Sequence, residues 1–209
     1  MANAESHPPN SASAALRAGA MGGFCAKPGI LLVVGLGNPG AAYLHSRHNL
    51  GQFILDDLAR NLNLKWINNR RLNADLARGR LGRQEILLAR PLSYMNDSGY
   101  PVQRIANYFK VPHEEIVIVY DDISLPLGEF KITRRCGSGG HNGMADVCDK
   151  LGECVRFRVG IGSKPDKEMD LKDFVLGKFS DEEQAAILYA MPTILTAIKS
   201  LANNPETST

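Results

Sequence analysis

The sequence is short of the features that mark several classes of protein. Its four cysteines form no Cys-x-x-Cys pair, which argues against a zinc ribbon or a disulfide framework and favours a reducing, cytosol-like compartment. No run of about 18 apolar residues occurs, so the sequence predicts no membrane-spanning segment. Gly-x-Ser-x-Gly, the setting of the nucleophilic serine in many hydrolases, is also absent.

Positive charge is barely in excess, with 24 Lys and Arg against 22 Asp and Glu. The distribution along the chain is nevertheless uneven. Residues 60–90 contain eight basic residues against Asp75 and Glu85, and residues 166–183 contain seven acidic residues. One basic face permits a polyanionic partner such as a nucleic acid, and a mixed-charge solvated surface is the alternative.

The length of 209 residues fits one domain with tails. Residues 1–29 are rich in Ala, Ser, Gly and Pro and lack apolar periodicity, which predicts a flexible extension. The domain is expected to span residues 30–200, with a tail at 201–209. The extension carries only Arg17 and Lys27 as basic residues, a weak match to a transit peptide. We therefore expect a cytoplasmic protein, with an organelle as the alternative.

Apolar patterning predicts strands alternating with helices. Short apolar or β-branched runs predict strands at residues 30–34, 74–79, 84–89, 116–120, 129–135 and 155–161. Helical periodicity predicts helices around residues 48–58 and 102–109, and at 144–151 and 181–199, the last kinked by Pro192. Ser46 is available to cap the first helix. This alternation predicts an α/β fold, a single three-layer domain with the sheet in the middle.

Ligands of open α/β sheets bind beyond the carboxyl ends of the strands, which directs attention to the loops that follow them. Residues 35–40, Gly-Leu-Gly-Asn-Pro-Gly, have the spacing of a dinucleotide-binding motif. Pro39 removes a backbone donor, however, and no helix opens within the glycines. A tight turn that presents Asn38 is the preferred interpretation. The glycine loop at 137–143 suits a phosphate, with a flexible connection as the alternative.

His48 is a candidate general base, because imidazole takes up a proton near neutral pH. Asp121 directly follows the predicted strand at 116–120 and is expected to enter the same crevice. A carboxylate there would fix the imidazole tautomer and favour the imidazolium that forms when a proton is taken. Asp122 is a competing choice for this partner.

Three asparagines, Asn38, Asn96 and Asn142, stand at three different strand-to-helix junctions. Each one taken alone is explained by a turn or a helix cap. Together, their amides could hold an acyl group and stabilise an oxyanion. With the predicted His48–Asp121 pair, they indicate water-mediated acyl hydrolysis without a covalent intermediate or a metal.

These residues lie in segments that resemble the bacterial-type peptidyl-tRNA hydrolase family. The matching segments run in the family's order and cover about residues 31–200. They are GLGNPGAAYLHSRHNLG (35–51), RPLSYMNDSG (90–99), VYDDISLPLGEFK (119–131), GSGGHNGM (137–144), RFRVGIGSKP (156–165) and DFVLGKFS (173–180). The resemblance implies an α/β fold around a twisted mixed sheet, a monomer, and no cofactor or metal. It also implies cleavage of the ester between a peptide and the terminal ribose of tRNA, which recycles tRNA from aborted translation.

The resemblance also implies roles for individual residues. His48 would be the general base, Asp121 would orient it, and Asn38 would place the scissile ester. The implied substrate-binding residues are Tyr43, Tyr94, Met95, Asn96, His141 and Asn142. The implied contacts to tRNA phosphates are Lys131, Arg134 and Arg158.

Three other interpretations stay open at this point. A plant-organelle branch of the same family acts in intron splicing, which makes a non-catalytic RNA-binding relative the first alternative. A nucleotide-dependent oxidoreductase is the second, because of the glycine motif. The third is an interaction domain whose asparagines only form turns.

Overall fold

The computed structural model describes residues 29–134 and 137–203. The predicted extension up to residue 28, Arg135, Cys136 and the end of the tail from residue 204 lie outside the described residues. The strands are β1 (Ile30–Gly35), β2 (Ile67–Asn69), β3 (Ala74–Leu81), β4 (Gln84–Pro91), β5 (Ile116–Asp122), β6 (Phe130–Thr133) and β7 (Val155–Gly160). The α-helices are α1 (Leu50–Asn61), α2 (Gly99–Phe109), α3 (Asn142–Leu151), α4 (Leu171–Leu176) and α5 (Asp181–Asn203), and short 3-10 helices are η1 (Arg47–Asn49), η2 (Met95–Asp97) and η3 (His113–Glu115).

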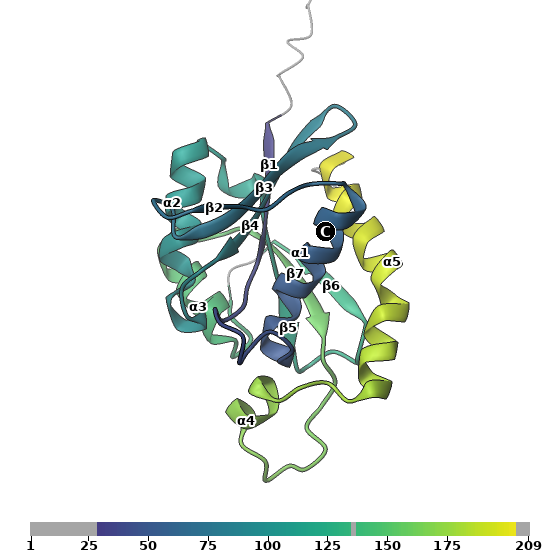
Figure 1. Cartoon of the computed structure of the whole chain (residues 1–209). Coiled ribbons are helices and arrows are strands. Elements are labelled where there is room, and N and C mark those ends of the chain that lie inside the picture. The colour runs from purple at the N-terminus through teal and green to yellow at the C-terminus, as the bar shows by residue number, and fades with distance from the viewer. Residues whose placement is uncertain (1–28, 135–136, 204–209) are drawn as a thin grey trace, which may run out of the picture.

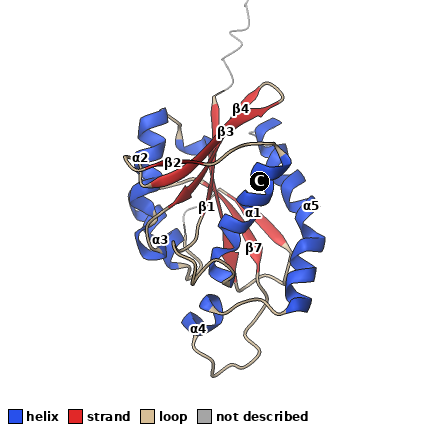
Figure 2. Cartoon of the chain, viewed as in Figure 1, coloured by secondary structure: helices blue, strands red, loops and turns tan. Residues whose placement is uncertain are grey.

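The seven strands form one mixed sheet in the order β2-β3-β4-β1-β5-β7-β6. The central strands β4, β1, β5 and β7 are parallel to one another. The edge strands are antiparallel, β3 to both β2 and β4, and β6 to β7. Figures 1 and 2 show helices on both sides of this sheet, which confirms the predicted three-layer α/β fold.

Two hydrophobic cores lie on the two faces of the sheet, and β1 contributes side chains to both of them. Successive side chains of a strand point to opposite faces. Leu31 and Val33 accordingly pack in the core under α1 and α5, while Leu32 and Val34 pack in the core under α2 and α3. The central strands therefore appear in the sequence as continuous apolar runs, as is typical of a sheet covered on both faces.

Glycines at the end of β1 and in the first turn of α1 allow these two elements to approach each other closely. A Cβ on Gly35 would lie 2.5 Å from the carbonyl oxygen of Gly51, and a Cβ on Gly51 would lie 2.3 Å from the carbonyl oxygen of Val119. Side chains at either position would push α1 away from the sheet. The glycines thus serve packing, and α1 begins only at Leu50, well beyond the Gly-x-Gly-x-x-Gly spacing.

The sequence analysis missed β2 and α4, each of which is too short to show periodicity. The expected side-chain cap at Ser46 was wrong, because its hydroxyl donates to the carbonyl oxygen of Tyr43 at 2.8 Å and caps no helix. Ion pairs neutralise part of the positive charge on the basic face that the sequence predicts. Three of its eight basic residues form ion pairs, Arg60 with Asp57, Arg78 with Glu85, and Arg90 with Asp56 and Asp75.

Helix α5 continues through Pro192. By length and composition alone, its segment Asp181–Ala202 is apolar enough to cross a membrane. In the fold, one side of the helix packs in the core under α1 and α5, as Ile187, Ile194 and Ile198 illustrate with exposed fractions of 0–1%, whereas Leu188 and Tyr189 are exposed. A core helix of a folded domain passes the same composition test, and 39% of the apolar window is buried inside the structure.

Candidate active site

A cavity of about 410 Å³ opens at the carboxyl end of the parallel strands. Its walls come from the loop after β1, from η1 and η2, from the end of β5, from the glycine loop before α3, and from α4. Seven of the twelve predicted site residues line it, namely Asn38, His48, Met95, Asn96, Asp121, His141 and Asn142. Six segments of the chain therefore build one site.

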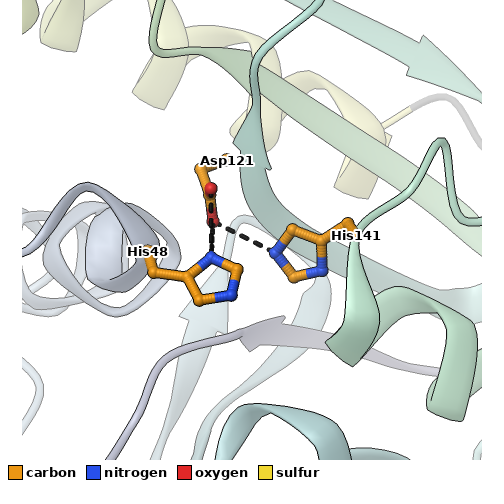
Figure 3. A group of neighbouring side chains, drawn as sticks. All are labelled: His48, Asp121 and His141. Atoms are coloured by element: carbon orange, nitrogen blue, oxygen red, sulfur yellow. Dashed lines mark hydrogen bonds and ion pairs between the residues drawn. The ribbon is translucent and has the colours of Figure 1, made fainter. Parts of the chain in front are cut away.

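His48 and Asp121 form the pair that the sequence predicts. Nδ1 of His48 lies 3.0 and 3.1 Å from the two carboxylate oxygens of Asp121, and both residues are buried. Figure 3 shows a second imidazole on the same carboxylate, because Nε2 of His141 lies 3.1 Å from Oδ1 of Asp121. Asp121 thus contacts two histidines that come from η1 and from the loop before α3.

The hydrogen bonds fix which nitrogen of each ring carries a proton. The backbone N–H of Met144 donates to Nδ1 of His141 at 3.1 Å, so Nε2 of His141 must be the donor to Asp121. A carboxylate only accepts, so Nδ1 of His48 also donates to Asp121. Nε2 of a neutral His48 is then left with a lone pair, which is the state a general base needs.

Burial of Asp121 by itself raises its pKa, because a carboxylate loses solvation in the interior. The opposing contributions are larger. The charge and hydrogen bond of His141, followed by those of His48, hold the pKa of Asp121 well below its ordinary value. Asp121 is therefore ionised at neutral pH and can stabilise an imidazolium beside it.

This depressed pKa predicts a pH-dependent contribution to stability. A carboxylate with a lower pKa in the folded state stabilises the protein above its unfolded pKa of about 3.9, and the contribution is lost as pH falls further. We expect wild-type protein to exceed Asp121→Asn in free energy of unfolding by roughly 1–3 kcal/mol from pH 7 to pH 5. The difference should shrink below about pH 4. Urea unfolding of both proteins across this range measures it, and a difference that grows in acid would contradict the assignment.

Asp122, the other candidate partner of His48, binds different residues. Its Oδ2 accepts from Nε of Arg158, and its Oδ1 accepts from the backbone N–H and the hydroxyl of Ser124 at 2.7 Å. Burial raises the pKa of Asp122, but these donors lower it below the ordinary value. Arg158 is in turn largely buried, with 18% of its side chain exposed. Arg158 is thus paired within the protein, and the phosphate contact expected from the sequence stays a prediction.

Asn38 is held by a neighbour that the sequence analysis did not single out. Asn49 accepts from the backbone N–H of Asn38 at 2.8 Å and donates to its carbonyl oxygen at 2.9 Å. The side-chain oxygen of Asn38 accepts from the backbone N–H of Met95 at 2.8 Å. Because the oxygen of the amide is taken, its NH2 end is left to donate to a group in the cavity. The sequence feature that could have identified Asn49 is its position directly after His48.

The remaining predicted residues lie outside the cavity lining. Tyr43 and Tyr94 contact each other edge to face, with ring centroids 6.5 Å apart. Neither residue lines this cavity, Tyr94 is exposed, and their expected role in substrate binding stays a prediction. Lys131 lies exposed on β6, and Arg134 directly follows that strand. Both are on the edge of the sheet next to β7, away from the basic segment of residues 60–90.

Helix α4 forms a wall of the cavity that no sequence signal predicted. Arg47, the residue before His48, attaches it to η1. The guanidinium of Arg47 lies 4.5 Å from the ring centroid of Phe174, donates to the carbonyl oxygen of Phe174 at 3.3 Å, and pairs with Glu183 at 2.7 Å. One side chain thus joins the segment of His48 to α4 and to the start of α5.

We expect Arg47→Met to lower the free energy of unfolding by about 1–3 kcal/mol, because it removes the ion pair and the charge on the aromatic ring. It should also raise KM, since α4 forms a wall of the cavity. Denaturant unfolding and steady-state kinetics test both effects. Glu183→Gln, which keeps the stacked guanidinium, should have a smaller effect on each. Unchanged stability in Arg47→Met would show that α4 is held by other contacts.

His48, Asp121 and His141 each offer one ligand atom, and these atoms lie within 4.8 Å of one another. Two imidazoles and a carboxylate are ligands that zinc accepts. The hydrogen bond that Met144 donates to Nδ1 of His141 argues against a metal site. Because Nδ1 accepts this bond, the proton of the neutral ring lies on Nε2, and a protonated nitrogen has no lone pair to give to a metal. The three residues fit a hydrogen-bonded catalytic group better than a metal centre.

An imidazole with a free nitrogen, oriented by a buried carboxylate in a cavity with amide donors, has the parts of a general-base hydrolase. Comparison with known proteins also points to a hydrolase. The family model described as peptidyl-tRNA hydrolase matches residues 32–209, and the chain belongs to the peptidyl-tRNA hydrolase family.

Individual relatives cover most of the chain. The peptidyl-tRNA hydrolase of Chloroflexus aurantiacus is 42% identical over 171 residues, which are 80% of this chain and 90% of the relative. That of Bacillus pumilus is 37% identical over 181 residues, 84% of this chain and 94% of the relative. The crystal structure of the Acinetobacter baumannii peptidyl-tRNA hydrolase superposes with a TM-score of 0.79 at 32% identity, covering 84% of this chain and 89% of that one.

Proposed function

We propose that the protein hydrolyses the ester that joins a peptide to the terminal ribose of tRNA, and so recycles tRNA from aborted translation. The observation that carries the proposal is the buried His48–Asp121 pair on the cavity, with Nδ1 of the imidazole on the carboxylate and Nε2 left to act. Membership of the peptidyl-tRNA hydrolase family supplies the substrate class.

In the proposed mechanism, Nε2 of His48 takes a proton from a water molecule as that water attacks the ester carbonyl. The imidazolium that forms is stabilised by the ionised carboxylate of Asp121. The negative charge that develops on the carbonyl oxygen needs a donor, and the NH2 group of Asn38, whose side-chain oxygen already accepts from Met95, would provide one. An activated water is sufficient for an ester, so the mechanism uses no covalent intermediate, cofactor or metal.

The other polar residues of the cavity have binding roles in this proposal. Asn96 and Asn142 face the cavity with exposed side chains and would hold the peptide and the terminal nucleotide. His141 would act through Asp121, which it contacts. Lys131 and Arg134 would bind tRNA phosphates along the β6 edge of the sheet.

We further propose that the protein acts as a monomer in the cytoplasm. The relatives named above are all bacterial, which favours this compartment over an organelle. The alternative of a non-catalytic RNA-binding relative is not favoured, because the matched proteins carry the name of the enzyme and the cavity holds the parts of a base-catalysed site.

Turnover of a defined substrate tests the proposal. Purified protein is mixed with tRNA that carries an N-acetylated aminoacyl group, and release of the acylated amino acid is measured. We expect many turnovers per protein molecule, and hydrolysis in ¹⁸O-labelled water should place one label in the released carboxylate. Tight binding of the tRNA without release would instead identify a non-catalytic RNA-binding protein.

A further inference from the structure

Among the residues that the structure describes, Lys172 is the one lysine or arginine that lines the cavity. It belongs to α4, and its backbone N–H donates to Asp170 at 2.8 Å, which fixes the start of the helix. Its side chain is exposed, and no carboxylate in the described part of the chain lies within 4.0 Å of its ammonium group. The cavity therefore contains a lysine charge that forms no ion pair with any of the described residues.

The carboxylates of the cavity do not compensate this charge. Asp121 accepts from two imidazoles, and Asp122 accepts from Arg158 and Ser124. Asp170 accepts the backbone N–H at the start of α4. Each carboxylate thus already has donors of its own, and the ammonium group is available to a ligand.

Lys172 also has a defined place relative to the reacting group. Helix α4 packs against η1, which carries His48, and Arg47 joins the two through Phe174. A ligand whose ester lies at His48 therefore has the lysine on the wall beside it. Lysine binds phosphate as a compact charge that reaches the anion on a flexible stem, so no rigid two-point geometry is needed.

We infer that Lys172 binds the phosphate on the 5′ oxygen of the terminal nucleotide of tRNA, the nucleotide that carries the ester. This inference rests on the proposed function, which brings a nucleotide into the cavity. It assigns Lys172 to binding of the nucleotide next to the scissile bond, and it makes no use of the phosphates farther along the tRNA.

The test measures binding, so that it does not depend on turnover. An N-acetyl-aminoacyl group is joined by a stable amide to the ribose of the terminal nucleoside, and the analogue is made with and without a 5′ phosphate. Calorimetric titration gives the Kd of each analogue for the wild-type protein, Lys172→Met and Lys172→Arg. Lys167→Met is the matched control, because Lys167 is an exposed lysine shortly before α4 that does not line the cavity.

The phosphate should tighten binding to the wild-type protein about 3- to 10-fold, the range for a partly exposed charge-assisted contact. This gain should disappear in Lys172→Met and persist in Lys172→Arg and Lys167→Met. Equal Kd values for the two analogues in the wild-type protein, a gain that survives in Lys172→Met, or no detectable binding of either analogue would overturn the inference. Failure of the proposed function is a separate result, namely no release from acylated tRNA.

A second measurement uses the natural class of substrate. Binding of acylated tRNA weakens with salt, and each single-strand phosphate contact adds about 0.7 to the slope of log K against log salt concentration. Lys172→Met should lower the slope by about this amount for binding of the whole tRNA. An unchanged slope would count against a phosphate contact at this residue.

Discussion

His48→Ala should lower kcat for N-acetyl-aminoacyl-tRNA by about 10²–10⁴-fold, the range that a positioned general base contributes. KM should change little, because the cavity keeps its amide groups and its α4 wall when the imidazole is removed. The structural reason is that His48 is buried beside Asp121 and lines the cavity, where in the proposed mechanism its second nitrogen deprotonates a water molecule. Steady-state and single-turnover kinetics with the same tRNA measure both constants.

His45→Ala is the matched control for this prediction. His45 is an exposed histidine three residues earlier, and it does not line the site cavity. Its loss should leave kcat within about twofold of wild type, as is usual for a surface position away from the chemistry. If His48→Ala raised KM and left kcat unchanged, His48 would be a binding residue and the proposed mechanism would be wrong.

Asp121→Asn should slow turnover by roughly 10- to 10²-fold, which is less than the loss of His48. The carboxylate accepts from one nitrogen of His48 and one of His141. An amide has one oxygen to accept with, so its NH2 group would face an imidazole N–H and could rotate the His48 ring or change its tautomer. The base would remain present but would lose its orientation and the charge that stabilises the imidazolium.

A double variant separates this role from a structural one. Because Asp121 is proposed to act through His48, the combination His48→Ala with Asp121→Asn should be no slower than His48→Ala alone. Multiplicative losses in the double variant would show that Asp121 contributes to turnover independently of the imidazole. Circular dichroism and thermal unfolding of each variant check that the fold is retained.

The sequence by itself determined the fold class. Apolar runs such as Ile116–Tyr120 of β5 are too short and too β-branched for helices, and they alternate with segments of helical period. A buried parallel sheet with helices on both faces follows from that alternation. The same reasoning placed His48, Asp121 and the three asparagines at the ends of strands, where open α/β sheets bind ligands.

Local patterns could not determine which of these side chains meet. Asp121 and Asp122 are adjacent and chemically identical, and successive strand residues point to opposite faces. The position of β5 between β1 and β7 directs Asp121 to the histidines and Asp122 to Arg158. The contribution of His141 to this group also depends on the loop before α3 reaching across the cavity.

Two features were set by the tertiary structure alone: the wall of the cavity that α4 forms, and which basic side chains are paired with carboxylates. Helix α4 has six residues, too few for a periodic signal, and long-range contacts of Arg47 keep it in place. Arg90 and Arg158 appear in the sequence as free basic residues, yet both are paired with carboxylates from other strands or helices. Composition determines how many charges a chain carries, whereas their partners are set by which strands and helices pack together.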